Sequence, residues 1–397
     1  MSMLKTDNLI VGYEKKKVVD GVDIQGLKGQ VVCLLGANGA GKTTILRTLS
    51  GLLAPLQGVV FLKDQNIATI DRKELAKQLS IVLTKRLSGE MMSVYEVVSM
   101  GRYPHTGFFG RLTAEDERKI EEALQTVHAS HLTERFFDEL SDGEKQKVLV
   151  ARAFVQEPEV IILDEPTTHL DIRHRLELID ILKRLSKEKG ITVMLSLHEI
   201  DIALKSCDQV VLVHNGKILA SGVPEEVVNE SIINQLYGIE NGTYNNLLGS
   251  VEIANSSASD VFVIGGGGYG TPVYRILTRH GIGLTTGILH ENDVDFEVAR
   301  TIGLDILREK AFEPIQEKTF LQALKKVDAV PSIIDAGSPI GTGNDKNRAI
   351  IEYALTKGKN VYSLRSEQEQ AMLFDQYASR IHFCANVSNV IEKMSFL

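Results

Sequence analysis

One eight-residue segment constrains the fold of this chain more than any other. Residues 36–43 read GANGAGKT, follow the apolar run VVCLL at 31–35, and precede a helical pattern from about Lys42 to Leu49. A strand that passes through glycines into a helix turns successive backbone N–H groups toward one point, where the helix N-terminus adds positive charge density. The spacing G-x-x-x-x-G-K-T therefore predicts a triphosphate site on an α/β fold. The alternative is a plain glycine turn with a surface lysine.

The chemistry of the loop assigns its residues. Lys42 neutralises the β- and γ-phosphates of ATP, and the hydroxyl of Thr43 ligates Mg²⁺. The nucleotide-binding residues expected in this segment are Gly36, Ala37, Asn38, Gly39, Ala40, Gly41, Lys42, Thr43 and Thr44.

A second motif lies downstream, where the run VIILDE ends in two acids. Four apolar residues predict a buried strand, at whose end Asp164 holds the Mg²⁺ shell and Glu165 polarises an attacking water. A strand ending in two solvated acids is the alternative, and the complete phosphate loop upstream favours the catalytic interpretation.

Residues 140–146, LSDGEKQ, lie shortly before that strand. They resemble the signature sequence of the ATP-binding-cassette (ABC) family, which begins LSGGQ or LSGGE. The resemblance implies that Ser141, Asp142, Gly143 and Glu144 close on ATP held by a second copy of the chain. Asp142 stands where many members have glycine. Ser141 and Glu144 also form the pattern of a helix capping box, which is compatible with that role.

Other positions match the family one by one. His198 in LSLHE resembles the switch histidine that touches the γ-phosphate, so the resemblance implies Lys42, Glu165 and His198 as the catalytic set. Asp171 resembles the D-loop aspartate. Tyr13 resembles the aromatic residue that stacks on adenine, with a packed strand tyrosine as the alternative. Thr84 departs from the family, which places a Mg²⁺-ligating glutamine there; either a water bridges Thr84 to the metal or the role is lost.

The 397 residues exceed one ordinary core and predict two domains. A P-loop NTPase domain of the ABC ATPase type is expected over 1–254, with antiparallel strands at the front of a mainly parallel sheet and a helical subdomain at about 88–155. A smaller Rossmann-like α/β domain is expected over 255–397. The second half of the polar run 240–259 is the expected linker.

The composition of the chain limits the classes of partner that we expect for it. The net charge of −8 makes nucleic acid an unexpected partner. No run of about 20 apolar residues predicts a membrane span, no signal peptide is expected, and Cys33, Cys207 and Cys384 indicate buried thiols in a reducing compartment. The resemblance implies a homodimer on the cytoplasmic face of the cell membrane, with permease subunits as partners and, indirectly, a substrate-binding protein.

Residues 92–105 carry the only indication of a transported substrate. Their pattern V-x-x-x-V-x-x-G-R-x-P resembles importers of iron–siderophore, haem and cobalamin, in the part of the family that faces the permease. An amphipathic helix that ends at Pro104 is the alternative. A stand-alone ATPase for cluster assembly or export, with the C-terminal domain as a ligand sensor, remains a second hypothesis.

The C-terminal domain contains two glycine clusters, at 265–270 and 337–345, each after a predicted strand. Two such loops at the carboxyl ends of parallel strands would line one crevice, where open α/β sheets bind ligands. Ligand binding and a purely structural scaffold both fit this pattern, and a regulatory role is a hypothesis.

Overall fold

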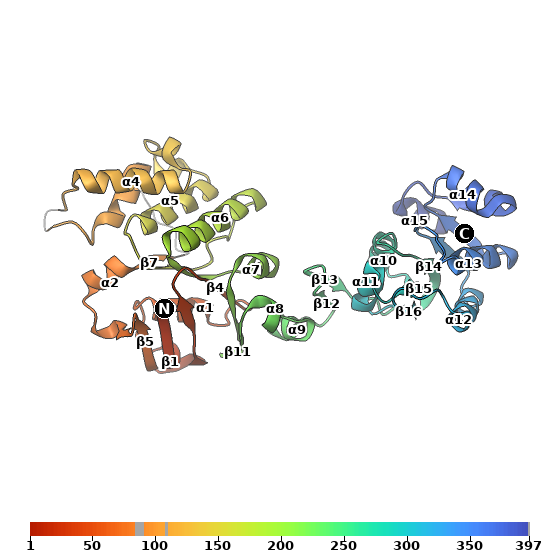
Figure 1. The fold of residues 1–397 in the computed structure, drawn as a ribbon, viewed down its shortest axis with the longest axis horizontal. Coiled ribbons are helices and arrows are strands. Elements are labelled where there is room, and N and C mark those ends of the chain that lie inside the picture. Colours follow the sequence, from red (N-terminus) through yellow and green to blue (C-terminus); the bar gives the residue numbers. More distant parts are fainter. Residues whose placement is uncertain (84–90, 108–109, 396–397) are drawn as a thin grey trace. The chain divides into compact units, whose positions relative to one another are not determined.

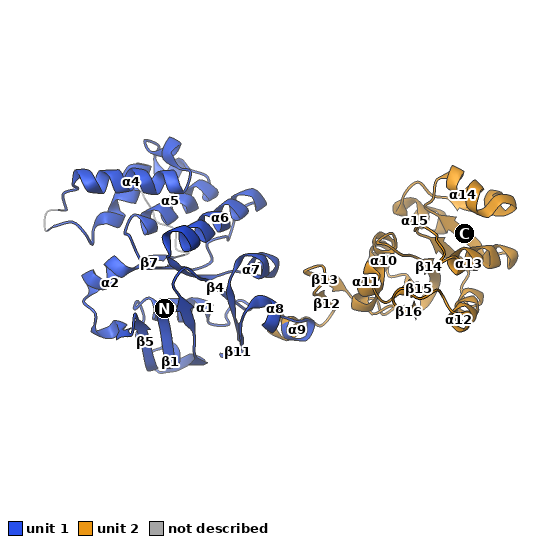
Figure 2. Ribbon diagram, viewed as in Figure 1, with its two compact units in different colours: residues 1–232 blue, residues 233–397 orange. Residues whose placement is uncertain are grey.

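The computed structural model describes residues 1–83, 91–107 and 110–395, and the chain forms two compact units (Figure 2). Unit 1 is Met1–Ile232 and unit 2 is Ile233–Leu397. Each unit has its own sheet and hydrophobic core, so the α/β fold class expected from the sequence is confirmed. None of the described helices has the length and apolar character needed to span a bilayer.

The sheet of unit 1 follows the order β6-β5-β1-β2-β11-β10-β4-β9-β8-β7, with β3 paired to β1. Its strands β10, β4, β9, β8 and β7 are mutually parallel, whereas β1 pairs antiparallel with β2, β3 and β5. The strands of unit 1 are β1 (Ser2–Tyr13), β2 (Lys16–Val22), β3 (Gln25–Leu27), β4 (Val31–Leu35), β5 (Gln57–Leu62), β6 (Gln65–Asn66), β7 (Leu79–Val82), β8 (Val160–Leu163), β9 (Thr192–Ser196), β10 (Gln209–His214) and β11 (Lys217–Gly222).

The helices of unit 1 flank this sheet, and Figure 1 shows α4 and α5 packed side by side. Their bounds are α1 (Lys42–Leu49), α2 (Arg72–Gln78), α3 (Val94–Ser99), α4 (Ala114–Thr126), α5 (Asp142–Phe154), α6 (Ile172–Lys189), α7 (Ile200–Ser206) and α8 (Pro224–Val227), and α9 (Glu230–Tyr237) begins at the unit boundary. The segment expected as a helical subdomain, about 88–155, contains α3, α4 and α5.

Unit 2 is a parallel sheet in the order β16-β15-β14-β17-β18-β19, preceded by the hairpin of β12 and β13. Its strands are β12 (Gly242–Asn245), β13 (Ser250–Ile253), β14 (Ser259–Ile264), β15 (Gly283–His290), β16 (Asp305–Glu309), β17 (Ser332–Asp335), β18 (Asn360–Ser363) and β19 (His382–Phe383). Its helices are α10 (Gly270–Arg279), α11 (Val294–Ile302), α12 (Glu317–Asp328), α13 (Lys346–Thr356), α14 (Glu367–Phe374) and α15 (Val387–Ser395).

The sheet of unit 2 is covered by helices on both faces. Along β14, Val261 and Val263 enter one core cluster, and Phe262 and Ile264 enter the other. Successive side chains of a strand point to opposite faces, so a strand buried on both sides is apolar throughout, as the run VFVI is.

The boundary between the units differs from the one expected after residue 254. The polar run 240–259 contains the β12–β13 hairpin, which packs on α11 within unit 2. Asn245 Nδ2 donates to Thr301 Oγ1 at 2.9 Å, and Arg275 pairs with the buried Glu252. The polar side chains that suggested a linker are therefore partners of this packing, and the compact unit begins at Ile233.

Candidate nucleotide-binding and catalytic site

The glycine-rich loop connects the buried strand β4 to α1, as the sequence predicts. β4 lies between β10 and β9, and all five of its residues are buried. Gly41 caps α1 with φ of 108°, in the left-handed region, and a Cβ on it would lie 2.3 Å from Val19 Cγ2. Only glycine can make this close approach, which fixes how the loop enters the helix.

Lys42 folds back over the inner side of the loop. Its side chain is buried, and Nζ donates to the carbonyl oxygens of Gly36 at 2.7 Å and Ala37 at 3.2 Å. Burial lowers the pKa of Lys42, and the charges of Glu165 and Asp164 act in the opposite direction. The ammonium group is therefore held within the loop, facing two carboxylates of the neighbouring strand end.

Three oxygen-bearing side chains meet beside the loop. Thr43 Oγ1 donates to Asp164 Oδ1 at 3.0 Å, and Ser196 Oγ donates to the same atom at 3.0 Å. Asp164 follows β8 and Ser196 ends β9, and β9 lies between β8 and β4 in the parallel part of the sheet. Parallel strands bring their carboxyl ends to one edge, so residues 120 or more positions apart converge there.

Glu165 and His198 form a pair next to Asp164. His198 Nε2 lies 2.8 Å from Glu165 Oε1, and the Glu165 backbone N–H donates to Ser196 Oγ at 2.9 Å. Glu165 has a φ of 49°, which turns the chain sharply after β8. The two side chains are 23% and 34% exposed, so water can reach the carboxylate.

The residues 141–144 begin α5, with Ser141 as its N-cap. Ser141 and Glu144 form the capping box: Ser141 N–H donates to Glu144 Oε2 at 2.9 Å and Ser141 Oγ donates to it at 2.8 Å. The hydrogen bond from the Ser141 N–H lowers the pKa of Glu144. Ser141 and Asp142 are exposed, and within the described part of the chain no hydrogen bond or ion pair joins 141–144 to 36–43.

Asp171 caps α6, and this start of the helix touches the start of α5. Asp171 Oδ1 accepts from the His174 N–H at 2.8 Å and lies 2.9 Å from His174 Nδ1, and these hydrogen bonds lower the pKa of Asp171. A Cβ on Gly143 would lie 2.5 Å from His174 Cγ. His174 lies outside the sequence motifs, and Ser196, although it lies within LSLHE, acts through contacts with Asp164 and Glu165 that adjacent residues do not indicate.

The remaining expected residues lie in several different environments. Tyr13 ends β1 and is 43% exposed, so it is not the packed strand tyrosine of the alternative interpretation. Asn38 and Gly39 are exposed at the tip of the loop, and Thr44 is buried in α1. Thr84 lies outside the described residues, so its proposed part in Mg²⁺ binding has no structural account.

Comparisons with known proteins agree with this arrangement. The model of the ABC transporter family matches residues 19–168. An uncharacterized ABC transporter ATP-binding protein of Methanocaldococcus jannaschii is 42% identical over 289 residues, which are 72% of this chain and 100% of that protein. This chain belongs to the ABC transporter ATP-binding proteins. The resemblance inferred from the motifs is confirmed.

Two further relatives carry names that specify a transported compound. The ferric enterobactin transport ATP-binding protein of Escherichia coli is 35% identical over 60% of this chain and 88% of its own length. The cobalamin import ATP-binding protein of Halobacterium salinarum is 30% identical over 340 residues, 83% of this chain and 85% of its own. Since 340 residues exceed unit 1, that similarity reaches into unit 2.

One solved structure shows the same fold for unit 1. A nucleotide-free ATP-binding cassette from an ABC transporter has a TM-score of 0.52 at 28% identity, covering 59% of this chain and 95% of that one. In unit 2, the model of the MJ0874 family matches residues 284–391.

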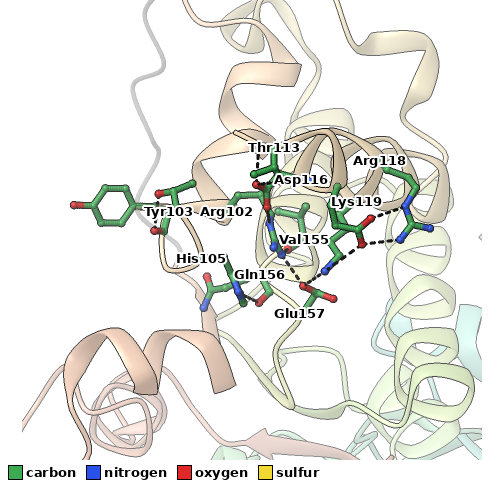
Figure 3. Close-up of polar contacts among 12 residues, drawn as sticks. Arg102, Tyr103, His105, Thr113, Asp116, Arg118, Lys119, Val155, Gln156 and Glu157 are labelled. Carbon is green, nitrogen blue, oxygen red and sulfur yellow. Dashed lines mark hydrogen bonds and ion pairs between the residues drawn. The ribbon is translucent and has the colours of Figure 1, made fainter. Parts of the chain in front are cut away.

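In this ABC ATPase, the stretch 92–105 has an inner and an outer side (Figure 3). Arg102 is buried: Nε donates to Asp116 Oδ1 at 2.7 Å, and Nη1 donates to the carbonyl oxygen of Val155 and to Glu157 Oε2, both at 2.8 Å. Tyr103 points away from this network and is 77% exposed. The arginine of the G-R-Y-P pattern thus holds the segment against α4 and the end of α5, and Tyr103 is its outward-facing member.

The hydrogen bonds of Asp116 also fix the start of α4. Thr113 is the N-cap, and its N–H and Oγ1 donate to Asp116 Oδ2 at 2.9 and 2.7 Å. Burial opposes ionisation of this carboxyl, yet the hydrogen bonds from Thr113 and the ion pair with Arg102 lower its pKa to about 2. Asp116 is therefore ionised at neutral pH and holds Arg102 in place.

The two glycine clusters of unit 2 meet, as expected. Ser338 Oγ donates to the Gly265 carbonyl oxygen at 3.1 Å, and both loops follow the carboxyl ends of neighbouring parallel strands, β14 and β17. No lysine follows the first cluster, which separates it from the loop of unit 1.

Proposed function

We propose that this chain is the ATP-hydrolysing subunit of a membrane importer whose cargo is a metal chelate of the siderophore or cobalamin type. The supporting observation is the convergence of Lys42, Thr43, Asp164, Glu165 and His198 at one sheet edge, in a chain similar to ferric enterobactin and cobalamin transport ATP-binding proteins. Positioning and electrostatic stabilisation account for most phosphoryl-transfer catalysis, and this edge supplies both.

The geometry supports the following roles. Lys42 and the N–H groups of the loop hold the terminal phosphates, Glu165 orients a water in line with the γ-phosphate, and His198 positions the Glu165 carboxylate through the 2.8 Å contact. Tyr13 contributes an exposed ring for the adenine. Thr44, buried in the first turn of α1, packs the helix on which this loop depends.

Mg²⁺ fits the residues present. Thr43 Oγ1 and Asp164 Oδ1 lie 3.0 Å apart in a partly buried position, and a hydroxyl and a carboxylate are oxygen ligands that Mg²⁺ prefers. These two residues would hold the ion, which would supply neutralisation of the phosphate charge when bound.

A second copy of the chain completes the site in this proposal. Ser141 and Asp142 are exposed at the start of α5 and make no described contact with the loop of their own chain. The γ-phosphate then bridges Lys42 of one copy and the residues Ser141, Gly143 and Glu144 of the other, and Asp171 lies beside this interface. ATP closes the dimer and hydrolysis opens it.

Permease subunits are the proposed membrane partner, contacted by the outward side of segment 92–105, where Met100 and Tyr103 are exposed. A substrate-binding protein would act on the other side of the permease, and this chain would lie on the cytoplasmic face.

The test is reconstitution of the full chain with its native permease in lipid vesicles. We expect ATP hydrolysis that rises when cargo is supplied and uptake that requires ATP, with both lost in Glu165→Gln, which should also accumulate as an ATP-bound dimer. Glu225→Gln, an exposed acid outside the site, is the matched control. ATP hydrolysis that is indifferent to permease and cargo would favour the stand-alone ATPase instead.

A further inference from the structure

The first glycine cluster of unit 2 lies where sheets of this topology bind ligands. From β14 the chain builds outward through β15 and β16, and it then returns to the other side of β14 with β17, β18 and β19. The strand order reverses between β14 and β17, and a crevice opens at the carboxyl ends of strands at such a point. In dinucleotide-binding proteins, the glycine turn and the helix N-terminus there receive a pyrophosphate.

In this chain the N–H groups of that turn are already bound to carboxylates. Asp295 Oδ2 accepts from the N–H groups of Gly266 at 2.8 Å and Gly270 at 2.7 Å, and Asp295 Oδ1 accepts from the N–H of Thr271 at 2.8 Å and its hydroxyl at 2.6 Å. Asp293 accepts from the Gly267 N–H at 2.8 Å. Both carboxylates come from the start of α11: Asp295 accepts from the first N–H groups of α10, and Asp293 also caps α11 itself.

Asp295 occupies this place completely. It is 0% exposed, and a Cβ added to Gly270 would lie 2.9 Å from Asp295 Oδ2 and 2.4 Å from Tyr274 Oη. The glycine therefore makes room for the chain's own carboxylate and tyrosine. A phosphate brought to the same donors would meet a buried negative charge.

Arg365, the buried cation beside the second glycine cluster, is also already paired with groups of the chain itself. Arg365 Nε donates to Asp335 Oδ2 at 2.8 Å, and both side chains are buried. Arg365 also binds the Ser338 carbonyl oxygen. The second glycine cluster thus offers no unpaired buried arginine to an anion.

A cavity of about 480 Å³ remains beside these loops. Every described residue that lines it is uncharged, and Tyr269, Pro272, Leu364 and Val387 supply side-chain surface. Tyr269 is 49% exposed and offers a ring face next to the backbone of Gly267 and Gly268. Gly267 also lines a second cavity of about 400 Å³, where Asp293 and Glu313 lie beside His290 and Asn292, and the two carboxylates disfavour an anion there.

We propose that this crevice binds an uncharged small molecule with a flat ring system, and that Asp295 stands permanently where a ligand phosphate would otherwise bind. Unit 2 is then a binding module that selects against phosphate-bearing ligands, the opposite preference from unit 1. The ring stacks on Tyr269, and the uncharged lining carries no penalty for an uncharged ligand.

Adenosine and adenosine 5′-monophosphate are a matched pair of probes, since they differ only in the phosphate. The natural sequence has no tryptophan, so Tyr269→Trp in the full chain places a single fluorophore in the crevice. We expect saturable fluorescence change with adenosine and at least tenfold weaker binding of the monophosphate and of inorganic pyrophosphate. Tyr103→Trp, in unit 1, is the control reporter and should not follow the same binding curve.

Asp295→Ala in the reporter chain should shift the preference toward the monophosphate by tenfold or more. Because that variant leaves buried donors without partners, Asp293→Asn serves as a milder variant that should shift the preference in the same direction. Glu297→Ala, on α11 but bonded to Arg300, should leave it unchanged. The proposal is overturned by equal or tighter binding of the monophosphate to the unsubstituted site, or by no saturable response to adenosine.

Discussion

The two glycine-rich loops of this chain occupy similar places, between a strand and a helix, and have opposite electrostatics. Each follows a buried parallel strand and opens a helix, the first into α1 and the second into α10. The loop of unit 1 holds the ammonium group of Lys42 against its own carbonyl oxygens, whereas the turn of unit 2 holds the carboxylates of Asp293 and Asp295 against its N–H groups. Glycine spacing therefore sets the shape of such a loop, and the side chain that faces it decides whether phosphate can bind.

Replacing the cation should remove the function of the first loop. We expect Lys42→Ala to lower the ATP hydrolysis rate by about 100-fold or more, in the range found when one preorganised phosphate- or oxyanion-stabilising group is lost. Phosphate release at saturating ATP measures this. Lys15→Ala, an exposed lysine upstream, should retain full activity, and a Lys42→Ala rate within a few-fold of the parent would break the comparison.

Replacing the anion should destabilise the second loop. Asp295→Ala leaves three N–H groups and one hydroxyl without their acceptor, so we expect the free energy of unfolding of unit 2 to fall by about 3 kcal/mol or more. Urea unfolding followed by the reporter Tyr269→Trp measures it. The exposed Asp260→Ala is the control. A loss below about 0.5 kcal/mol would mean that the carboxylate is not what holds the turn.

The sequence predicts what is local. The loop 36–43, the strand before the paired acids, and the hairpin turn at Asn215 and Gly216, with φ of 45° and 71°, all follow from adjacent residues. The partner of the second glycine turn is not local, since Asp295 acts 25 residues after Gly270. The contact of His174 with Gly143 and the packing of the polar run 240–259 on α11 also join residues that are far apart in the sequence. Adjacent residues therefore do not predict them.

Asp116, a buried carboxylate of unit 1, shows how much such an anion contributes to the free energy of unfolding. The pKa of Asp116 lies at about 2, below its ordinary 3.8, so its stabilisation is complete above about pH 4 and is lost as the pH falls toward 2. The shift corresponds to roughly 2 kcal/mol. We expect Asp116→Asn to lower the free energy of unfolding by that amount at pH 7, with the difference from the parent disappearing near pH 2.

Urea titrations at several pH values provide the measurement. Glu115→Gln, an exposed neighbour on α4, should show a much smaller effect. A deficit of Asp116→Asn that stays constant from pH 7 to pH 2 would show that loss of the charge is not its cause.

An exposed tyrosine lies near each loop, Tyr13 in unit 1 and Tyr269 in unit 2. The smallest predicted effect concerns Tyr13. Stacking is worth about 0.5–1.5 kcal/mol, so Tyr13→Ala should raise the KM for ATP about three- to tenfold with little change in kcat. Tyr13→Phe should preserve KM. Equal KM values for all three proteins would remove Tyr13 from the adenine site.

A crystal structure of the full-length Glu165→Gln chain with ATP and Mg²⁺ tests the central contrast most directly. The account predicts triphosphate on residues 36–43, with Ser141 of a second copy at the γ-phosphate, and Asp295 still bound to the turn of unit 2 with no phosphate there. A phosphate group at 265–270, or a triphosphate site in which Ser141 of neither copy faces the γ-phosphate, would contradict it.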